Sequence, residues 1–61
     1  MRIKNCPSEA WNYEFIVVNR IENEYEYVTH TTDGFLADSL ANDLKNGVVV
    51  HNVRIQGKKR D

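Results

Sequence analysis

The feature that most constrains the fold is the amount of strand-forming sequence relative to helix. Three apolar, β-rich runs at 13–18, 25–29 and 48–55 accompany a single amphipathic helix predicted over 35–44. In at least two of these runs, apolar side chains occupy both alternating positions, so both faces of the resulting sheet carry apolar groups. One short helix covers only one face. We therefore expect the other face to meet a second copy of the chain or a partner protein.

The length of 61 residues corresponds to one domain, which we place at 1–56, followed by a polar, basic tail at 57–61. Domains below ~70 residues often depend on disulfides, a metal or oligomerisation. Cys6 is the only cysteine, so the chain cannot form an internal disulfide. A single cysteine, no apolar leader and no apolar stretch near the ~20 residues that span a bilayer favour a cytoplasmic protein without a membrane segment.

Two of the runs are typical of a β-hairpin. Residues 11–19 are rich in aromatic and β-branched side chains, and 25–31 return as the second strand. We predict Glu22 and Asn23 as a two-residue loop, with Asn23 at positive φ. In that register Val18 faces Tyr27 and Phe15 faces His30. One face then carries Phe15, Val17 and Val28, and the other carries Ile16, Val18, Tyr25 and Tyr27.

The helix has clear start and stop signals. Thr32 or Asp33 is suited to cap its first amides, and Gly47 is predicted to take the left-handed conformation just past its end. The apolar stripe comprises Leu36, Ala37, Leu40, Ala41 and Leu44.

The last run, 48–55, is predicted to be an interior strand because valines fill both of its alternating positions. A right-handed crossover through the helix places it parallel to the second hairpin strand and next to the first. A short strand within 1–5 is a further candidate. The fold class is therefore α+β: a three- to four-stranded, mostly antiparallel sheet with one helix packed on one face, in the order (β)ββαβ.

The aromatic residues of the hairpin region are the best candidates for a binding surface. Aromatic side chains supply large contact areas and are enriched at interaction hot spots. The same rings also suit the core of a small domain, and the sequence leaves these two roles open. The predicted partner or dimer interface comprises Trp11, Tyr13, Ile16, Val18, Tyr25 and Tyr27.

The net charge of -1 conceals an acidic body and a basic end. The predicted acidic surface comprises Glu14, Glu22, Glu24, Glu26, Asp38 and Asp43. The alternative function, nucleic-acid binding, depends on Arg54 and the tail residues Lys58, Lys59 and Arg60. Because an acidic body repels phosphate, we expect a protein partner in preference to nucleic acid.

The sequence contains no pattern typical of a catalytic or metal site. His30 and Asp33 are the only closely spaced pair of strong metal ligands, whereas a structural zinc site uses about four ligands. Cys6 precedes Pro7 and has no fixed cation in the sequence to activate it. We therefore expect no catalytic residue, no metal, no cofactor and no small-molecule substrate.

The order of elements over 13–44, with 34–41 opening the helix, resembles the three-stranded sheet modules at the N-termini of phage and transposon integrases. Those modules insert their sheet into the DNA major groove. Here the hairpin carries glutamates where a DNA reader needs lysine or arginine, so no functional residue is carried over. The short acidic chain is also similar to the accessory and inhibitor proteins of phages and mobile elements. The predicted function is a non-enzymatic interaction or regulatory protein, acting as a homodimer or by docking its open sheet face or acidic surface on a partner.

Overall fold

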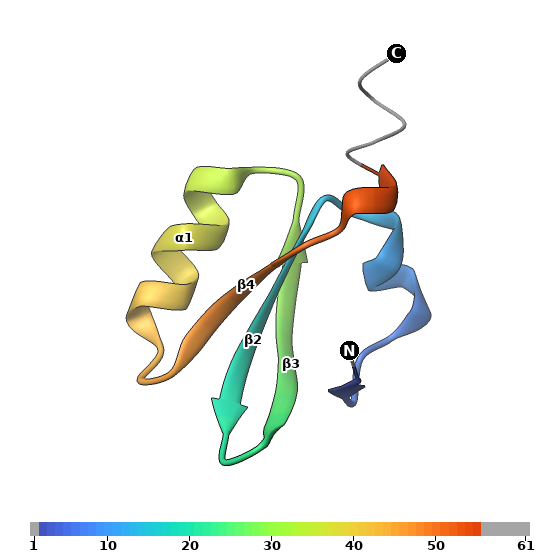
Figure 1. The fold of residues 1–61 in the computed structure, drawn as a ribbon. Helices are drawn as coiled ribbons and strands as arrows, with labels where there is room; N and C mark the ends of the chain where they lie inside the picture. Colours follow the sequence, from blue (N-terminus) through green and yellow to red (C-terminus); the bar gives the residue numbers. More distant parts are fainter. Residues whose placement is uncertain (1, 56–61) are drawn as a thin grey trace.

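The computed structural model describes residues 2–55. Four strands form one mixed sheet in the order β1-β3-β2-β4, with a single α-helix on one face (Figure 1). The elements are β1 (Ile3–Lys4), the 3₁₀ helix η1 (Ser8–Asn12), β2 (Phe15–Ile21), β3 (Glu24–Thr31), α1 (Gly34–Asp43) and β4 (Gly47–His51). The α+β class is confirmed. The sheet is mixed because β1 runs parallel to β3, whereas β2 is antiparallel to both β3 and β4.

The first hairpin strand begins later than predicted, because the segment before it forms η1. The backbone N–H of Ala10 donates to the Pro7 carbonyl, and that of Tyr13 donates to the Ala10 carbonyl, each at 3.1 Å. Proline suits the start of such a turn because its φ is fixed, here at -70°. Trp11 therefore lies outside the sheet, although its side-chain type is typical of a strand.

The hairpin connection has the predicted length, since Ile21 pairs with Glu24 across a two-residue loop. The residue at positive φ is Glu22, at 57°, and not Asn23 as predicted. The tight loops that join twisted strands need positive φ at their first central position. The geometry of the loop therefore places Glu22 at positive φ, although asparagine is the residue type that prefers this conformation.

From the hairpin loop to the Val18–Tyr27 pair, the β2–β3 register agrees with the prediction. Between Val18 and Val17 it shifts by one residue at a β-bulge. Val28 has no partner on β2 and is exposed. His30 consequently lies opposite Ile16 and not opposite Phe15. Because a bulge inserts one extra residue, it reverses the faces of all positions beyond it. It places His30 on the sheet face away from α1.

Helix α1 begins as predicted, with Asp33 as its N-cap. The Asp33 Oδ1 accepts hydrogen bonds from the backbone N–H groups of Phe35, at 2.9 Å, and Leu36, at 3.3 Å. These bonds satisfy two of the amides that a helix N-terminus leaves without partners.

The role predicted for Gly47 is wrong, because no described glycine has positive φ. Glycine is required there for a different reason. A Cβ built on Gly47 would lie 2.0 Å from the carbonyl oxygen of Ala41 and 2.7 Å from its Cα. The connection from α1 to β4 therefore passes against the helix backbone, where no side chain fits.

Strand β4 lies next to β2 as predicted, but it ends at His51 and not at residue 55. The prediction of an interior strand is wrong, because β4 is at the edge of the sheet; its valines contact the two core layers above and below it. The side chain of Asn52 is buried, and its Nδ2 donates to the carbonyl oxygens of Trp11, at 2.7 Å, and Tyr13, at 3.1 Å. These two bonds hold the end of β4 against the segment before β2. Residues 53–55 then continue as a helical turn.

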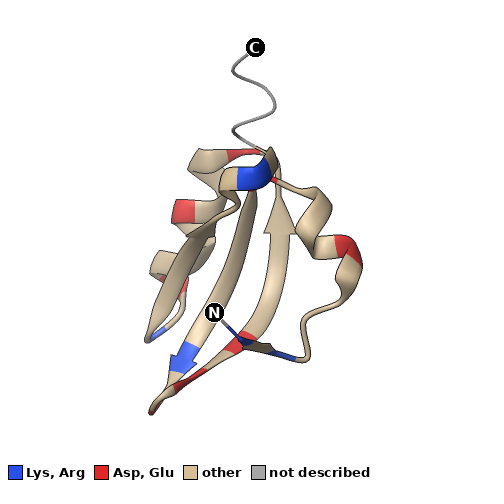
Figure 2. Ribbon diagram, turned by 45° about the vertical axis from the view of Figure 1, so that its right-hand side comes forward, with Lys and Arg blue, Asp and Glu red and all other residues tan. Residues whose placement is uncertain are grey.

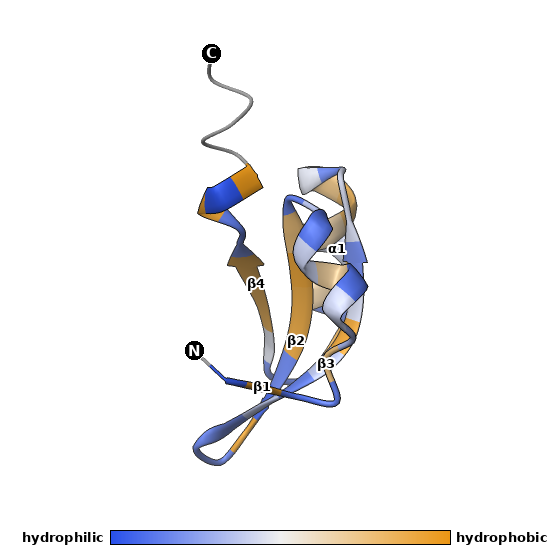
Figure 3. Cartoon of the chain, turned by 90° about the vertical axis from the view of Figure 1, so that its right-hand side faces the viewer, coloured by the Kyte–Doolittle hydropathy of each residue, from blue (hydrophilic) through white to orange (hydrophobic). Residues whose placement is uncertain are grey.

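The chain packs residues of its own on both faces of the sheet, whereas the sequence prediction gave cover to one face only. On the α1 side the core comprises Val17, Ala37 and Ala41, with Phe15, Leu40, Leu44 and Val49 packed against them. On the other side it comprises Ala10, Ile16 and Val18, with Ile3, Cys6, Tyr25, Tyr27, Val48 and Val50. The N-terminal segment through η1 supplies this second layer (Figure 1). Hydrophobic residues accordingly concentrate in β2 and β4, as Figure 3 shows.

Among residues 2–55, no helix has the length and apolar character needed to cross a membrane. The predicted tail at 57–61, with Lys58, Lys59 and Arg60, lies outside the described residues.

Candidate functional site

The structure divides the predicted interface residues between core and surface. Ile16 and Val18 are 0% exposed and offer no contact area to a partner. Tyr25 and Tyr27 are half-buried and pack against that core. Trp11 is exposed, because it lies on η1 and outside the sheet. Most of the predicted interface residues therefore belong to the layer between the N-terminal segment and the sheet.

A cluster of ionisable side chains lies within this layer. The Tyr27 hydroxyl is 2.6 Å from Nδ1 of His30, and the ring of Tyr13 lies 4.3 Å from the His30 ring, centroid to centroid. Burial raises the pKa of Tyr27, and the neighbouring Cys6 and Glu9 raise it further. Burial also raises the pKa of the Cys6 thiol. A protonated thiol is a poor nucleophile, so the arrangement favours a structural role for this cluster.

Exposed apolar side chains gather at the opposite end of the sheet from the hairpin loop. Phe35, in the first turn of α1, is 88% exposed, an unusual value for so large a ring. Leu36 beside it is also exposed, although the helical pattern placed it on the core stripe. Trp11 and Val53 are the other two exposed residues of this group.

Three of these side chains line two grooves: Phe35 lines the first, and Trp11 and Val53 line the second. The first, of about 400 Å³, is lined by Phe15, Gly34, Phe35, Asp38, Val49 and His51. The second, of about 490 Å³, is lined by Trp11, His51, Asn52, Val53 and Arg54. His51 borders both, and its ring meets that of Phe15 edge-on at 5.4 Å. We call the lining residues of both grooves, together with the exposed Leu36, the end surface.

The predicted acidic residues fall into separate groups (Figure 2). Glu22, Glu24 and Glu26 lie at the hairpin end of the sheet, and Asp38 and Asp43 lie on α1. Glu14 immediately precedes β2, at the far end from the hairpin loop. The carboxylates therefore do not form one continuous acidic surface, and only Asp38 borders the end surface.

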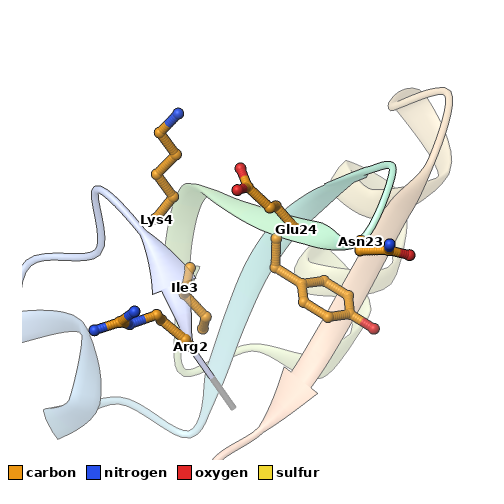
Figure 4. Close-up of a pocket in the computed structure, with 6 residues that line it drawn as sticks. Arg2, Ile3, Lys4, Asn23 and Glu24 are labelled. Carbon is orange, nitrogen blue, oxygen red and sulfur yellow. The ribbon is translucent and has the colours of Figure 1, made fainter.

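A third hollow, of about 430 Å³, lies at the hairpin end between β1 and β3. Its lining is mixed in charge: Arg2, Ile3, Lys4, Asn23, Glu24 and Tyr25. Figure 4 shows Lys4 and Glu24 extending to the same side of the hollow. Residues 2–55 contain no group of three side chains able to hold a metal ion.

No protein-family model, curated protein or solved structure matches the chain.

Proposed function

We propose that the chain is a small non-enzymatic interaction or regulatory protein that binds a partner through its end surface. The observation that carries this proposal is Phe35, a large ring held almost fully in solvent by a capped helix. Single exposed apolar residues are common and need no explanation. Here the ring lines the first groove, and His51 borders both that groove and the second one, which the exposed Trp11 and Val53 line. Exposed apolar side chains beside grooves suit a binding hot spot. We place this activity in the cytoplasm, as for the accessory proteins of phages and mobile elements.

The end surface combines an apolar centre with charged residues at its border. Asp38 borders the first groove and Arg54 the second. Charges at the border of an interface orient a partner and affect its association rate more than its final affinity. In this proposal the ring of Phe35 supplies contact energy, and Asp38 and Arg54 set the orientation.

Replacing Phe35 with serine should abolish partner capture while leaving the fold intact. Because the ring is 88% exposed, we expect the free energy of unfolding to stay within about 0.5 kcal/mol of wild type. Truncation of a hot-spot aromatic costs about 2 kcal/mol or more of binding free energy, which weakens affinity at least ~30-fold. The measurement is affinity capture from the source cells with mass identification, followed by titration of the captured partner.

Ile21→Ser is the matched control, because Ile21 is also exposed but lies at the hairpin end. It should capture the same partner as wild type. Equal capture by wild type and Phe35→Ser would contradict the proposal.

Nucleic-acid binding is the second candidate, and one observation favours it. Arg54 and the exposed indole of Trp11 line the same groove, a pairing that suits phosphate contact and base stacking. Labelled single-stranded DNA and RNA, titrated at low salt, test this candidate where phosphate attraction is strongest. Binding that Trp11→Ala weakens would support it, and absence of binding at low salt would exclude it.

A further inference from the structure

Strand β4 forms an edge of the sheet whose outer side pairs with no other strand among residues 2–55. The backbone N–H of Arg20 donates to the Asn46 carbonyl, and that of Asn52 donates to the Glu14 carbonyl, each at 2.9 Å. In an antiparallel ladder the residues that bond to one neighbour alternate with those that point away. Val48 and Val50 therefore bond toward β2, and the backbone groups of Gly47, Val49 and His51 point outward.

This edge lacks the features that usually prevent strand addition. Residues 46–52 contain no lysine, no other charged residue and no proline. The β2–β4 register continues from Phe15 to Asn19 without a bulge, and Figure 2 shows β4 free of charge. Natural proteins normally protect an exposed edge with one of these features, because an open edge is a template for another strand. The β4 edge is therefore suited to pairing with another strand.

We propose that this occupant is a second copy of the chain, joined by antiparallel pairing of the two β4 strands about a two-fold axis at Val49. The inference rests on the proposed function and specifies its partner. In this register Val49 pairs with Val49 of the second copy, and Gly47 pairs with His51 of the second copy. Each outward N–H then meets an outward carbonyl, since a two-fold axis makes the contact self-complementary.

The side chains match under the same symmetry. Val48 faces Val50 of the second copy on one side of the sheet, and the two Val49 side chains meet on the other. All three valines are only half-buried in the single chain, so the pairing would complete their burial. Cross-strand pairs of β-branched residues stabilise a sheet. No like charges meet within the paired strands, because β4 contains no lysine, arginine, aspartate or glutamate.

The area that a stable dimer requires brings Phe35 into the interface. A standard interface buries about 800 Å² per partner, roughly one sixth of the 4682 Å² exposed here. A five-residue strand provides only part of that area. Because α1 runs antiparallel to β4, the symmetry sets the two helices side by side and antiparallel, with Phe35 near the C-terminal end of the other helix. The core is also small, since three of the six buried apolar residues within 2–55 are alanines.

The test combines sedimentation equilibrium with amide hydrogen exchange of the full chain over a range of concentrations. We expect a monomer–dimer equilibrium in which the amides of Val49 and His51 become protected as the dimer forms. Val48 and Val50 should be protected at every concentration by their bonds to β2. A monomer at millimolar concentration, or a dimer whose Val49 amide exchanges freely, would overturn the inference.

Two variants extend the test. Val49→Pro removes the central outward N–H and should give a monomer. Because Val49 also packs against the core on the α1 side, Phe35→Ser provides a second variant that leaves this core intact. It should raise the dimer dissociation constant at least ~30-fold, and Ile21→Ser should leave that constant unchanged. A monomeric chain that still captures a different protein in a Phe35-dependent manner would overturn self-pairing and leave the proposed function standing.

Discussion

Replacing Gly47 with alanine is expected to unfold the protein. The added Cβ would lie 2.0 Å from the carbonyl oxygen of Ala41, and the conflicting atoms belong to the helix backbone and cannot move aside as a side chain can. We expect the free energy of unfolding to fall by about 3 kcal/mol or more. A domain of this length has a total stability of only roughly 3–9 kcal/mol. Circular dichroism with urea titration should therefore show a largely unfolded chain at 25 °C.

Gly34→Ala is the matched control for this prediction. A Cβ at that position would meet only the Phe15 ring, at 3.3 Å, and the ring is a side chain with room to adjust. Because alanine also has the higher helix propensity, stability should stay within about 1 kcal/mol of wild type. A folded Gly47→Ala protein with wild-type stability would contradict the close approach of the α1–β4 connection to Ala41.

Asn52→Asp is expected to give the second-largest decrease in the free energy of unfolding. The size of this decrease should depend on pH. The Nδ2 of Asn52 donates to two carbonyl oxygens, and a carboxylate at this buried position would face both without a proton to donate. We expect the free energy of unfolding to fall by about 2–4 kcal/mol at pH 7. Urea unfolding of wild type and variant at several pH values measures the difference.

The direction of the pH effect follows from the pKa of the introduced carboxyl group. Burial and the two carbonyl oxygens raise its pKa in the folded state above the unfolded value of about 3.9. The difference in the free energy of unfolding between wild type and the variant should therefore be smallest below about pH 4. It should grow as the pH rises through the folded-state pKa of the introduced carboxyl group. Asn12→Asp makes the same chemical change at an exposed position and should have little effect at any pH. A pH-independent deficit for Asn52→Asp would contradict the two assigned hydrogen bonds.

The regular elements were predictable because their signals are local. The Asp33 cap, the two-residue hairpin loop and the position of β4 beside β2 follow from short-range chemistry and crossover handedness. The bulge at Val28 was not predictable, because no residue there has a distinctive preference. It nevertheless decides which face His30 occupies.

The cover on the second sheet face was missed for a physical reason. The N-terminal segment contributes Ile3, Cys6 and Ala10, which follow neither strand nor helix periodicity. Small and irregularly spaced apolar residues produce no pattern, although Ala10 is fully buried. One feature of the sequence did point to the end surface. Phe35 is a large apolar residue in the helix that does not belong to its apolar stripe, and its ring is exposed.

This chain packs its own residues on both faces of its sheet, and we propose that it binds through the end surface and the β4 edge. Amide NMR spectra of the labelled protein, free and in its associated state, test it most directly. We expect chemical-shift changes on association to concentrate at Phe35, Val49, His51 and Val53. The chemical shifts of Ile16, Val18 and Tyr25 should stay unchanged. Changes concentrated at Ile3, Tyr25 and Tyr27 would contradict it, because they would show that the N-terminal layer opens to expose the sheet face.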